Sequence, residues 1–83
     1  MLTIRVKFVA SELAPGLTDG EYNIEDGSTV LNLLKLCESA CGASVPPKNF
    51  DFMLPLFNGK PVMLSSAITE DGTLHLCRII AGG

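Results

Sequence analysis

The chain lacks any run of apolar residues approaching the ~20 that a membrane-spanning helix needs. It also lacks a cluster of lysine and arginine, and its formal net charge is -3. Phosphate backbones attract positive surfaces, so this charge argues against a nucleic-acid partner. A mildly acidic domain meets a basic protein surface more naturally, although three charges steer an encounter only weakly.

Histidine and cysteine are also scarce, with one and three residues respectively. The cysteine count is odd, which does not suit a set of disulfides. The first residues alternate apolar and polar side chains and carry charge, so they do not read as a secretion signal. Both observations predict reduced thiols in the cytoplasm. Cys37 and Cys41 share one face of an expected helix, but a metal site needs more ligands than His75 can add. We therefore expect no metal site, and plain thiols at Cys37, Cys41 and Cys77.

The residues that are present suit one small globular domain. The 83 residues leave room for a single domain, and 47% of them are apolar, which is ample for a core. No internal repeat, low-complexity segment or linker interrupts the sequence. We predict one domain over residues 1–83, with a flexible tail over residues 79–83.

The first 25 residues predict two paired strands. Residues 2–8 alternate apolar and polar side chains, which is typical of a strand with one face on a core. Residues 10–20 form a loop, whose Leu13 and Leu17 either cap the core or await a partner, and capping is favoured. Residues 21–25 form a second strand, which we expect to pair antiparallel with the first.

A helix follows, running from Val30 to about Cys41. Ser28 or Thr29 is suited to cap its first turn, and Gly42 is suited to end it. Apolar residues recur along it at helical spacing and make one buried face, which Leu31 and Leu36 widen. The face consists of Val30, Leu33, Leu34, Cys37 and Cys41.

A hairpin is predicted in the second half of the chain. Residues 43–51 form a loop, and residues 52–57 form a strand whose Pro55 requires an edge position or a bulge. Asn58-Gly59 is the strongest two-residue hairpin signal, and it leads into a short return strand over residues 60–63.

The last strand is expected to complete the sheet. Residues 64–68 are predicted to make one helical turn, and residues 73–80 a strand that lies beside residues 2–8 in the middle of the sheet. His75 falls on the polar side of this strand, where a solvated or hydrogen-bonded role is favoured over a catalytic one. The order of elements indicates an α+β fold, a mixed sheet of about five strands with one main helix packed across it.

The sequence closes with Ala81-Gly82-Gly83, which has almost no side-chain bulk. Terminal glycines are often merely frayed. Alternatively, the missing Cβ atoms let the carboxylate of Gly83 enter a slot that larger residues would block, with Gly82 and Ala81 giving clearance.

Together with the order of elements, this ending resembles the ubiquitin-like β-grasp superfamily, and within it the sulfur carriers of the MoaD and ThiS type. The ending is similar to that of ThiS, whereas the long loop over residues 10–20 and the segment over residues 43–51 are similar to longer MoaD chains. The resemblance is carried by residues 26–30, 57–60, 70–72 and 79–83.

The resemblance implies a carrier without catalytic residues or a bound cofactor of its own. A partner of the MoeB or ThiF type would adenylate the carboxylate of Gly83 with ATP and magnesium. Sulfur from a persulfide would then give a thiocarboxylate, which a sulfur-accepting synthase (a large subunit or a thiazole synthase) would use for molybdopterin or thiamine. A ubiquitin-like modifier joined through Gly83 to lysines, and a β-grasp binding module with an incidental tail, remain open.

Partner contacts are expected in two places. On the tail, Arg78 is either solvated or paired with a partner's acidic residue, and Ile79 and Ile80 either contact the partner or pack on the sheet edge. The hairpin could extend an apolar docking face, although core packing is favoured for at least one of its residues. These hairpin residues are Leu56, Phe57 and Met63.

Overall fold

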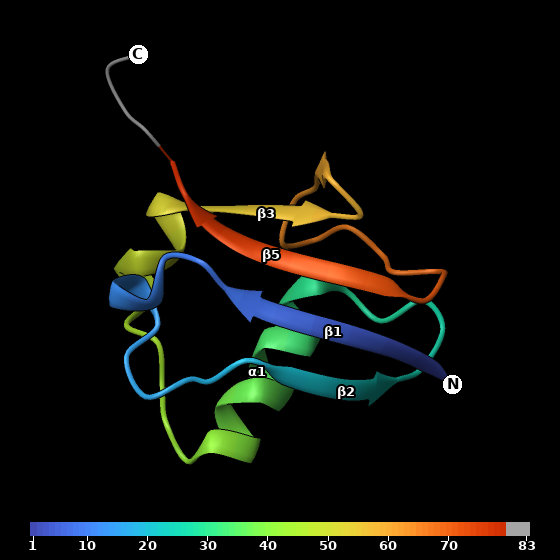
Figure 1. Ribbon diagram of the computed structural model, residues 1–83, viewed down its shortest axis with the longest axis horizontal. Coiled ribbons are helices and arrows are strands. Elements are labelled where there is room, and N and C mark those ends of the chain that lie inside the picture. The colour runs from blue at the N-terminus through green and yellow to red at the C-terminus, as the bar shows by residue number, and fades with distance from the viewer. Residues whose placement is uncertain (80–83) are drawn as a thin grey trace.

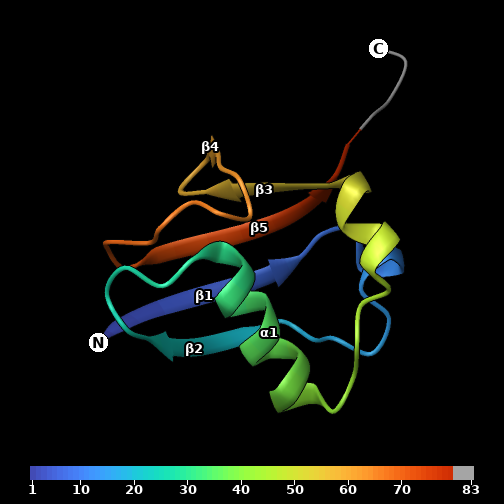
Figure 2. The same ribbon diagram turned by 180° about the vertical axis from the view of Figure 1, so that it is seen from behind.

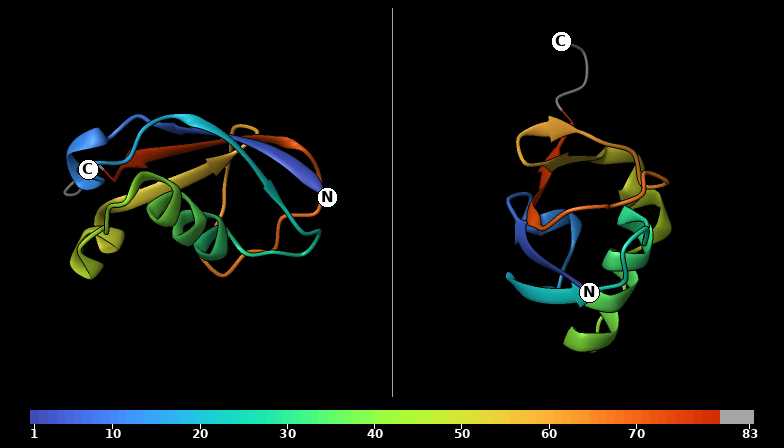
Figure 3. Two further views of the ribbon diagram at one scale, coloured as in Figure 1. Left: turned by 90° about the horizontal axis from the view of Figure 1, so that it is seen from below. Right: turned by 90° about the vertical axis from the view of Figure 1, so that its right-hand side faces the viewer.

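The computed structural model describes residues 1–79. These residues form one five-stranded sheet with strand order β2-β1-β5-β3-β4, and the helix α1 covers one of its faces (Figures 1 and 3). The predicted mixed sheet with one main helix is therefore confirmed. The elements are β1 (Leu2–Phe8), the 3-10 helix η1 (Ser11–Leu13), β2 (Gly20–Ile24), α1 (Val30–Cys41), the 3-10 helix η2 (Pro47–Phe52), β3 (Met53–Phe57), β4 (Lys60–Pro61) and β5 (Gly72–Arg78).

Strand β5 lies in the middle of the sheet, as predicted. It pairs parallel with β1 and antiparallel with β3, while β1 pairs antiparallel with β2. Its Leu74 and Leu76 are 0% and 1% exposed and, with Ile4 and Val6 of β1, belong to the core that includes the buried face of α1. Figure 2 shows α1 lying across this side of the sheet. Burial of these four side chains fixes the position of β5, because a shift by one residue would turn its apolar set away from the core.

Helix α1 has the caps that the sequence predicts. The hydroxyl of Thr29 accepts a hydrogen bond from the Asn32 amide at 3.1 Å, and Gly42 adopts the left-handed conformation at φ 65°. The expectation for Leu36 is wrong, because its side chain is 39% exposed and does not widen the buried face. Leu31 is half-buried.

The segment that crosses the start of α1 keeps only part of the predicted helical turn over residues 64–68: the Ser66 amide donates to the Met63 carbonyl at 3.0 Å, and the chain beyond it is extended. It is extended enough that Ala67 forms a β-bridge with Thr29. Its carbonyls at Ser66 and Leu64 accept hydrogen bonds from the amides of Val30 and Leu31, at 3.0 and 2.9 Å. The first amides of a helix have no partner within the helix, so this segment satisfies them and gives up helical geometry of its own.

Strand β3 is not at the edge, although β4 beside it has only two residues. Pro55 is accommodated because its carbonyl accepts from the Val62 amide at 3.0 Å, on the β4 side. The N–H and C=O of one strand residue point the same way, so the donor that Pro55 lacks would also have faced β4. The pairing of β3 with β5 is thereby left intact, and β4 ends at Pro61.

Two short 3-10 helices lie together at the end of the sheet where β5 ends (Figure 1). The segment over residues 43–51 is therefore not wholly a loop, because η2 occupies its second half and includes Phe52, which had been expected in a strand. The Asn49 side chain donates to the Leu13 carbonyl at 2.9 Å and joins η2 to η1. Leu13 and Leu17 are 6% and 7% exposed, so they cap the core as favoured. We call η1 and η2 together the collar.

Candidate functional site

The backbone of β5 is held on both sides at its end. On the β1 side, the Ala10 amide donates to the Leu76 carbonyl at 3.0 Å. On the β3 side, the Ile79 amide donates to the Phe52 carbonyl at 2.8 Å, so the pairing continues one residue past β5. The point from which the chain runs on toward Gly83 is thus fixed in the fold. Of the predicted flexible tail over residues 79–83, Ile79 is held by this hydrogen bond, and residues 80–83 lie outside the described residues.

Arg78 is exposed and pairs with Glu12 of η1. Its guanidinium lies 3.1 Å from the Glu12 carboxylate, and both side chains are more than half exposed. A backbone hydrogen bond, and then the one from Arg78, lower the pKa of Glu12 below its usual value. Such an exposed pair contributes little to stability. Its effect is to leave the two charges neutralised beside the end of β5.

Three large apolar side chains lie exposed around this point. Val9 is 63% exposed, Phe52 is 49% exposed and Ile79 is 40% exposed. The register places Val9 on the β1 side of β5 and Phe52 on the β3 side next to Ile79. We call these three residues the root patch. Grouped exposed apolar side chains beside a functional end are typical of a protein contact.

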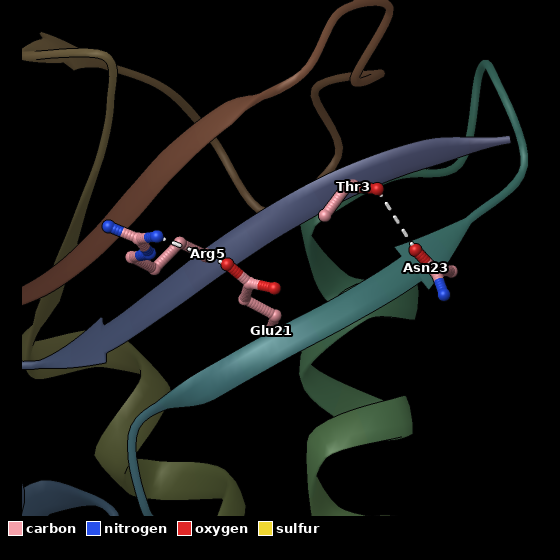
Figure 4. A network of polar contacts seen from close by, with 4 residues as sticks. All are labelled: Thr3, Arg5, Glu21 and Asn23. Carbon is pink, nitrogen blue, oxygen red and sulfur yellow. Dashed lines mark hydrogen bonds and ion pairs between the residues drawn. The ribbon is translucent and has the colours of Figure 1, made fainter.

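The face of the sheet that α1 leaves open has two unlike halves. Over β1 and β2 it is polar, with Arg5 bound to Glu21 at 3.1 Å and the Thr3 hydroxyl bound to Asn23 at 3.0 Å (Figure 4). Over β5 and β3 it is less polar and half-buried. The side chains of that second half are Leu54, Leu56, His75 and Cys77.

The hairpin residues expected to bind a partner separate in space. Leu56 lies half-buried on the open face opposite His75, whereas Phe57 packs against the core. Met63 is 70% exposed and lies beyond β4, away from the root patch. The structure brings none of the three together with Arg78 and Ile79, and their partner contacts stay predictions.

Val9 and Phe52 were missed by the sequence analysis. Phe52 was assigned to a strand, where its exposure could not be foreseen. A weak signal was available, because Val9 continues the alternation of β1 and is an apolar residue on the side that carries Thr3, Arg5 and Lys7.

The three cysteines are free thiols, as expected. Burial raises the pKa of Cys37 to about 11. Hydrogen bonds from Thr18 lower the pKa of the half-buried Cys41, whose sulfur also lies 3.9 Å from the Tyr22 hydroxyl. These contacts tie the loop before β2 to the end of α1, so their evident role is structural.

The described part of the chain gives little support for a metal site, a membrane-spanning helix or a ligand pocket near the root patch. Within residues 1–79 no group of three or more His, Cys, Asp or Glu side chains could hold a metal ion. No helix in that range has the length and hydropathy to cross a bilayer. Two open surface depressions, of about 470 and 340 Å³, lie away from the root patch, one at the end of α1 and one over the start of β5.

No protein-family model matches the sequence, and no curated protein matches it by sequence. Solved structures do resemble it. A molybdopterin converting factor, subunit 1, from Pyrococcus furiosus aligns with a TM-score of 0.65 at 14% identity, over 96% of this chain and 100% of that one. Small archaeal modifier protein 1 of Haloferax volcanii aligns with a TM-score of 0.69 at 18% identity, over 96% of this chain and 100% of that one.

The same shape also occurs within a larger chain. ATBAG1, solved in complex with HSP70, aligns with a TM-score of 0.59 at 14% identity, over 94% of this chain but 40% of its own. At such identities the likeness concerns the fold. This chain has the ubiquitin-like β-grasp fold that MoaD-type and small archaeal modifier proteins share.

Proposed function

We propose that this protein is a sulfur carrier whose reactive group is the carboxylate of Gly83. A partner enzyme of the MoeB or ThiF type adenylates it, and a sulfur-accepting synthase uses the resulting thiocarboxylate in the synthesis of molybdopterin or thiamine. The proposal requires Gly83 to end the working protein, whether as encoded or after processing.

The chemistry explains why a carrier needs so little of its own. A carboxylate oxygen of Gly83 attacks the α-phosphate of ATP, pyrophosphate leaves, and the acyl carbon gains AMP as a leaving group. The terminal sulfur of a persulfide then attacks that carbon and expels AMP. A second thiol then attacks the other sulfur of this acyl disulfide and forms a new disulfide with it, and the thiocarboxylate leaves with the electron pair of the broken sulfur–sulfur bond. Acid, base, magnesium and persulfide all belong to the partners.

One observation carries the proposal. The central strand β5 is held on the β1 side up to Leu76 and on the β3 side up to Ile79, four residues before Gly83, at an end of the sheet where apolar side chains are exposed. Because the backbone up to Ile79 is already fixed, only the last four residues lose freedom on binding. Two glycines without Cβ atoms then let the last carboxylate enter a narrow pocket of another protein.

Deleting Gly83 tests this proposal. The truncated chain should give no pyrophosphate exchange with the MoeB/ThiF-type enzyme of its own organism, while its urea unfolding midpoint stays unchanged. Gly82→Val should also block exchange by bulk alone, with Gly82→Ala as the matched smaller change. Undiminished adenylation of the truncated chain would count decisively against Gly83 as the reactive residue.

A second candidate is a ubiquitin-like modifier, which the likeness to small archaeal modifier protein 1 favours. It would use the same activated Gly83 but end in an isopeptide bond to lysine. Antibody blots of the native cell separate the two, since a modifier gives a ladder of conjugates that a variant without Gly82 and Gly83 lacks. A β-grasp binding module predicts instead that this variant keeps its function.

A further inference from the structure

The collar holds the root patch in place. The Asn49 side chain joins η2 to the Leu13 carbonyl of η1, and Leu13 is anchored in the core. The Phe52 carbonyl at the end of η2 binds the Ile79 amide. The exposed ring of Phe52 is therefore carried by a segment that is tied at one end to η1 and at the other to the end of β5.

The distance from the collar to Gly83 is short. Four residues follow Ile79 in the sequence, and at about 3.3–3.6 Å per residue an extended chain spans about 14 Å at most. Any enzyme whose pocket closes on the Gly83 carboxylate must therefore reach within that distance of Ile79. Stable protein interfaces cover about 800 Å² on each partner, far more than four slim residues offer, so the enzyme must also cover part of the collar.

The charges on the collar and at the end of β5 indicate what kind of partner surface would be complementary to this region. Arg78 and Glu12 neutralise each other at 3.1 Å, and η2 adds one exposed cation, Lys48, and one exposed anion, Asp51. The collar and the end of β5 are thus electrically balanced, while the root patch is apolar. A complementary surface is an apolar recess without strong charge.

We propose that the root patch is the anchor by which the activating enzyme binds this protein, with Phe52 inserted in an apolar recess of that enzyme. Phe52 and Val9 then decide affinity, and Asn49 is a positioning residue that acts through Phe52. The inference rests on the proposed function, since it assumes an enzyme that closes on Gly83. It adds the place where that enzyme binds and the chemistry of its surface.

The test is pyrophosphate exchange as a function of carrier concentration, with the full chain and the MoeB/ThiF-type enzyme of the same organism. Phe52→Gln should raise KM about 30-fold, the size of an interface hot spot, with kcat within about twofold of wild type. Val9→Gln and Ile79→Gln should raise KM less. Leu36→Gln, which changes a similarly exposed side chain on α1, is the matched control and should leave KM unchanged.

Two further measurements test the role of Asn49 and the charge of the anchor. Asn49→Ala loses one part-buried hydrogen bond, so its urea midpoint should fall slightly while the chain stays folded under the assay conditions. Its KM should rise with kcat near wild type, and a wild-type KM for this folded variant would show that Asn49 does not position Phe52. For the wild-type chain, KM should change less than about threefold between about 0.05 and 0.5 M salt, because the anchor carries no net charge. A steep salt dependence would contradict the apolar recess.

The outcomes separate this inference from the proposed function. Exchange with the wild-type chain, together with a normal KM for Phe52→Gln and Val9→Gln, would overturn the anchor and leave the proposed function standing. Absence of exchange with the wild-type chain and its cognate enzyme would overturn both.

Discussion

The two ends of β5 are built differently. At its start, the Asn58 side chain accepts from the Thr73 amide at 3.0 Å, Asp71 accepts from the Thr3 amide at 3.0 Å, and a Cβ at Gly72 would overlap the Asn58 carboxamide. At its end, the backbone bonds continue to Ile79, but the side chains are exposed.

The contrast predicts that the two ends of β5 differ in what they contribute: stability at the start and binding at the end. Side-chain hydrogen bonds at the start join β5 to the β3–β4 turn and to β1, so changes there should cost stability. At the end, the backbone is held while Val9, Phe52 and Ile79 stay exposed, so under the proposed function changes of these side chains should cost binding. The following substitutions test that difference.

Leu74→Ala and Ile79→Ala give the largest expected contrast. Leu74 is 0% exposed, so its truncation should lower the free energy of unfolding by about 2–5 kcal/mol. Ile79 is 40% exposed, and its truncation should cost about 0.5 kcal/mol or less. Urea unfolding followed by circular dichroism measures both, and equal losses would refute the contrast.

Gly72→Ala should have an intermediate effect. The added Cβ displaces the Asn58 carboxamide, and the Thr73 amide then loses its acceptor. The expected loss of unfolding free energy is about 0.5–1.5 kcal/mol, because this hydrogen bond is exposed to solvent. Asn58→Ala removes the same acceptor, so the double variant should lose less than the sum of the two single losses. Full additivity would show that the two residues act separately.

Glu12→Gln should have the smallest effect on stability. It removes the exposed ion pair with Arg78, and such pairs often contribute nothing measurable. The pKa of Glu12 is lowered in the folded protein, so any contribution is present above its unfolded pKa and disappears as the pH falls through the folded value. Urea midpoints of wild type and variant should coincide at pH 7 and at pH 3, and a clear gap at pH 7 alone would show a stronger pair.

Local signals allowed much of the fold to be predicted. The alternation of residues 2–8, the helical spacing from Val30 to Cys41 and the Asn58-Gly59 turn each act within a few residues. The segment over residues 64–68 escaped prediction because its conformation depends on the amides of Val30 and Leu31, which are distant in sequence. The position of β3 escaped because Pro55 is excluded only from bonds on one side.

The candidate site was predicted less completely. Arg78 is exposed as expected, but it pairs with Glu12 of the same chain. For Ile79 both partner contact and packing on the sheet edge were left open, and its side chain is 40% exposed. The contribution of Val9 and Phe52 depends on where β1 ends and on η2, both of which are set by contacts between η1, η2 and β5. A flexible tail and the chemistry at Gly83 stay predictions.

The most direct test of a reactive Gly83 is the intact mass of the full chain after incubation with its activating enzyme, ATP, magnesium and a sulfur donor. A thiocarboxylate replaces one oxygen by one sulfur, and fragmentation should place that exchange at Gly83. An unchanged mass, or the addition of a whole sulfur atom at Cys37, Cys41 or Cys77, would contradict the proposal.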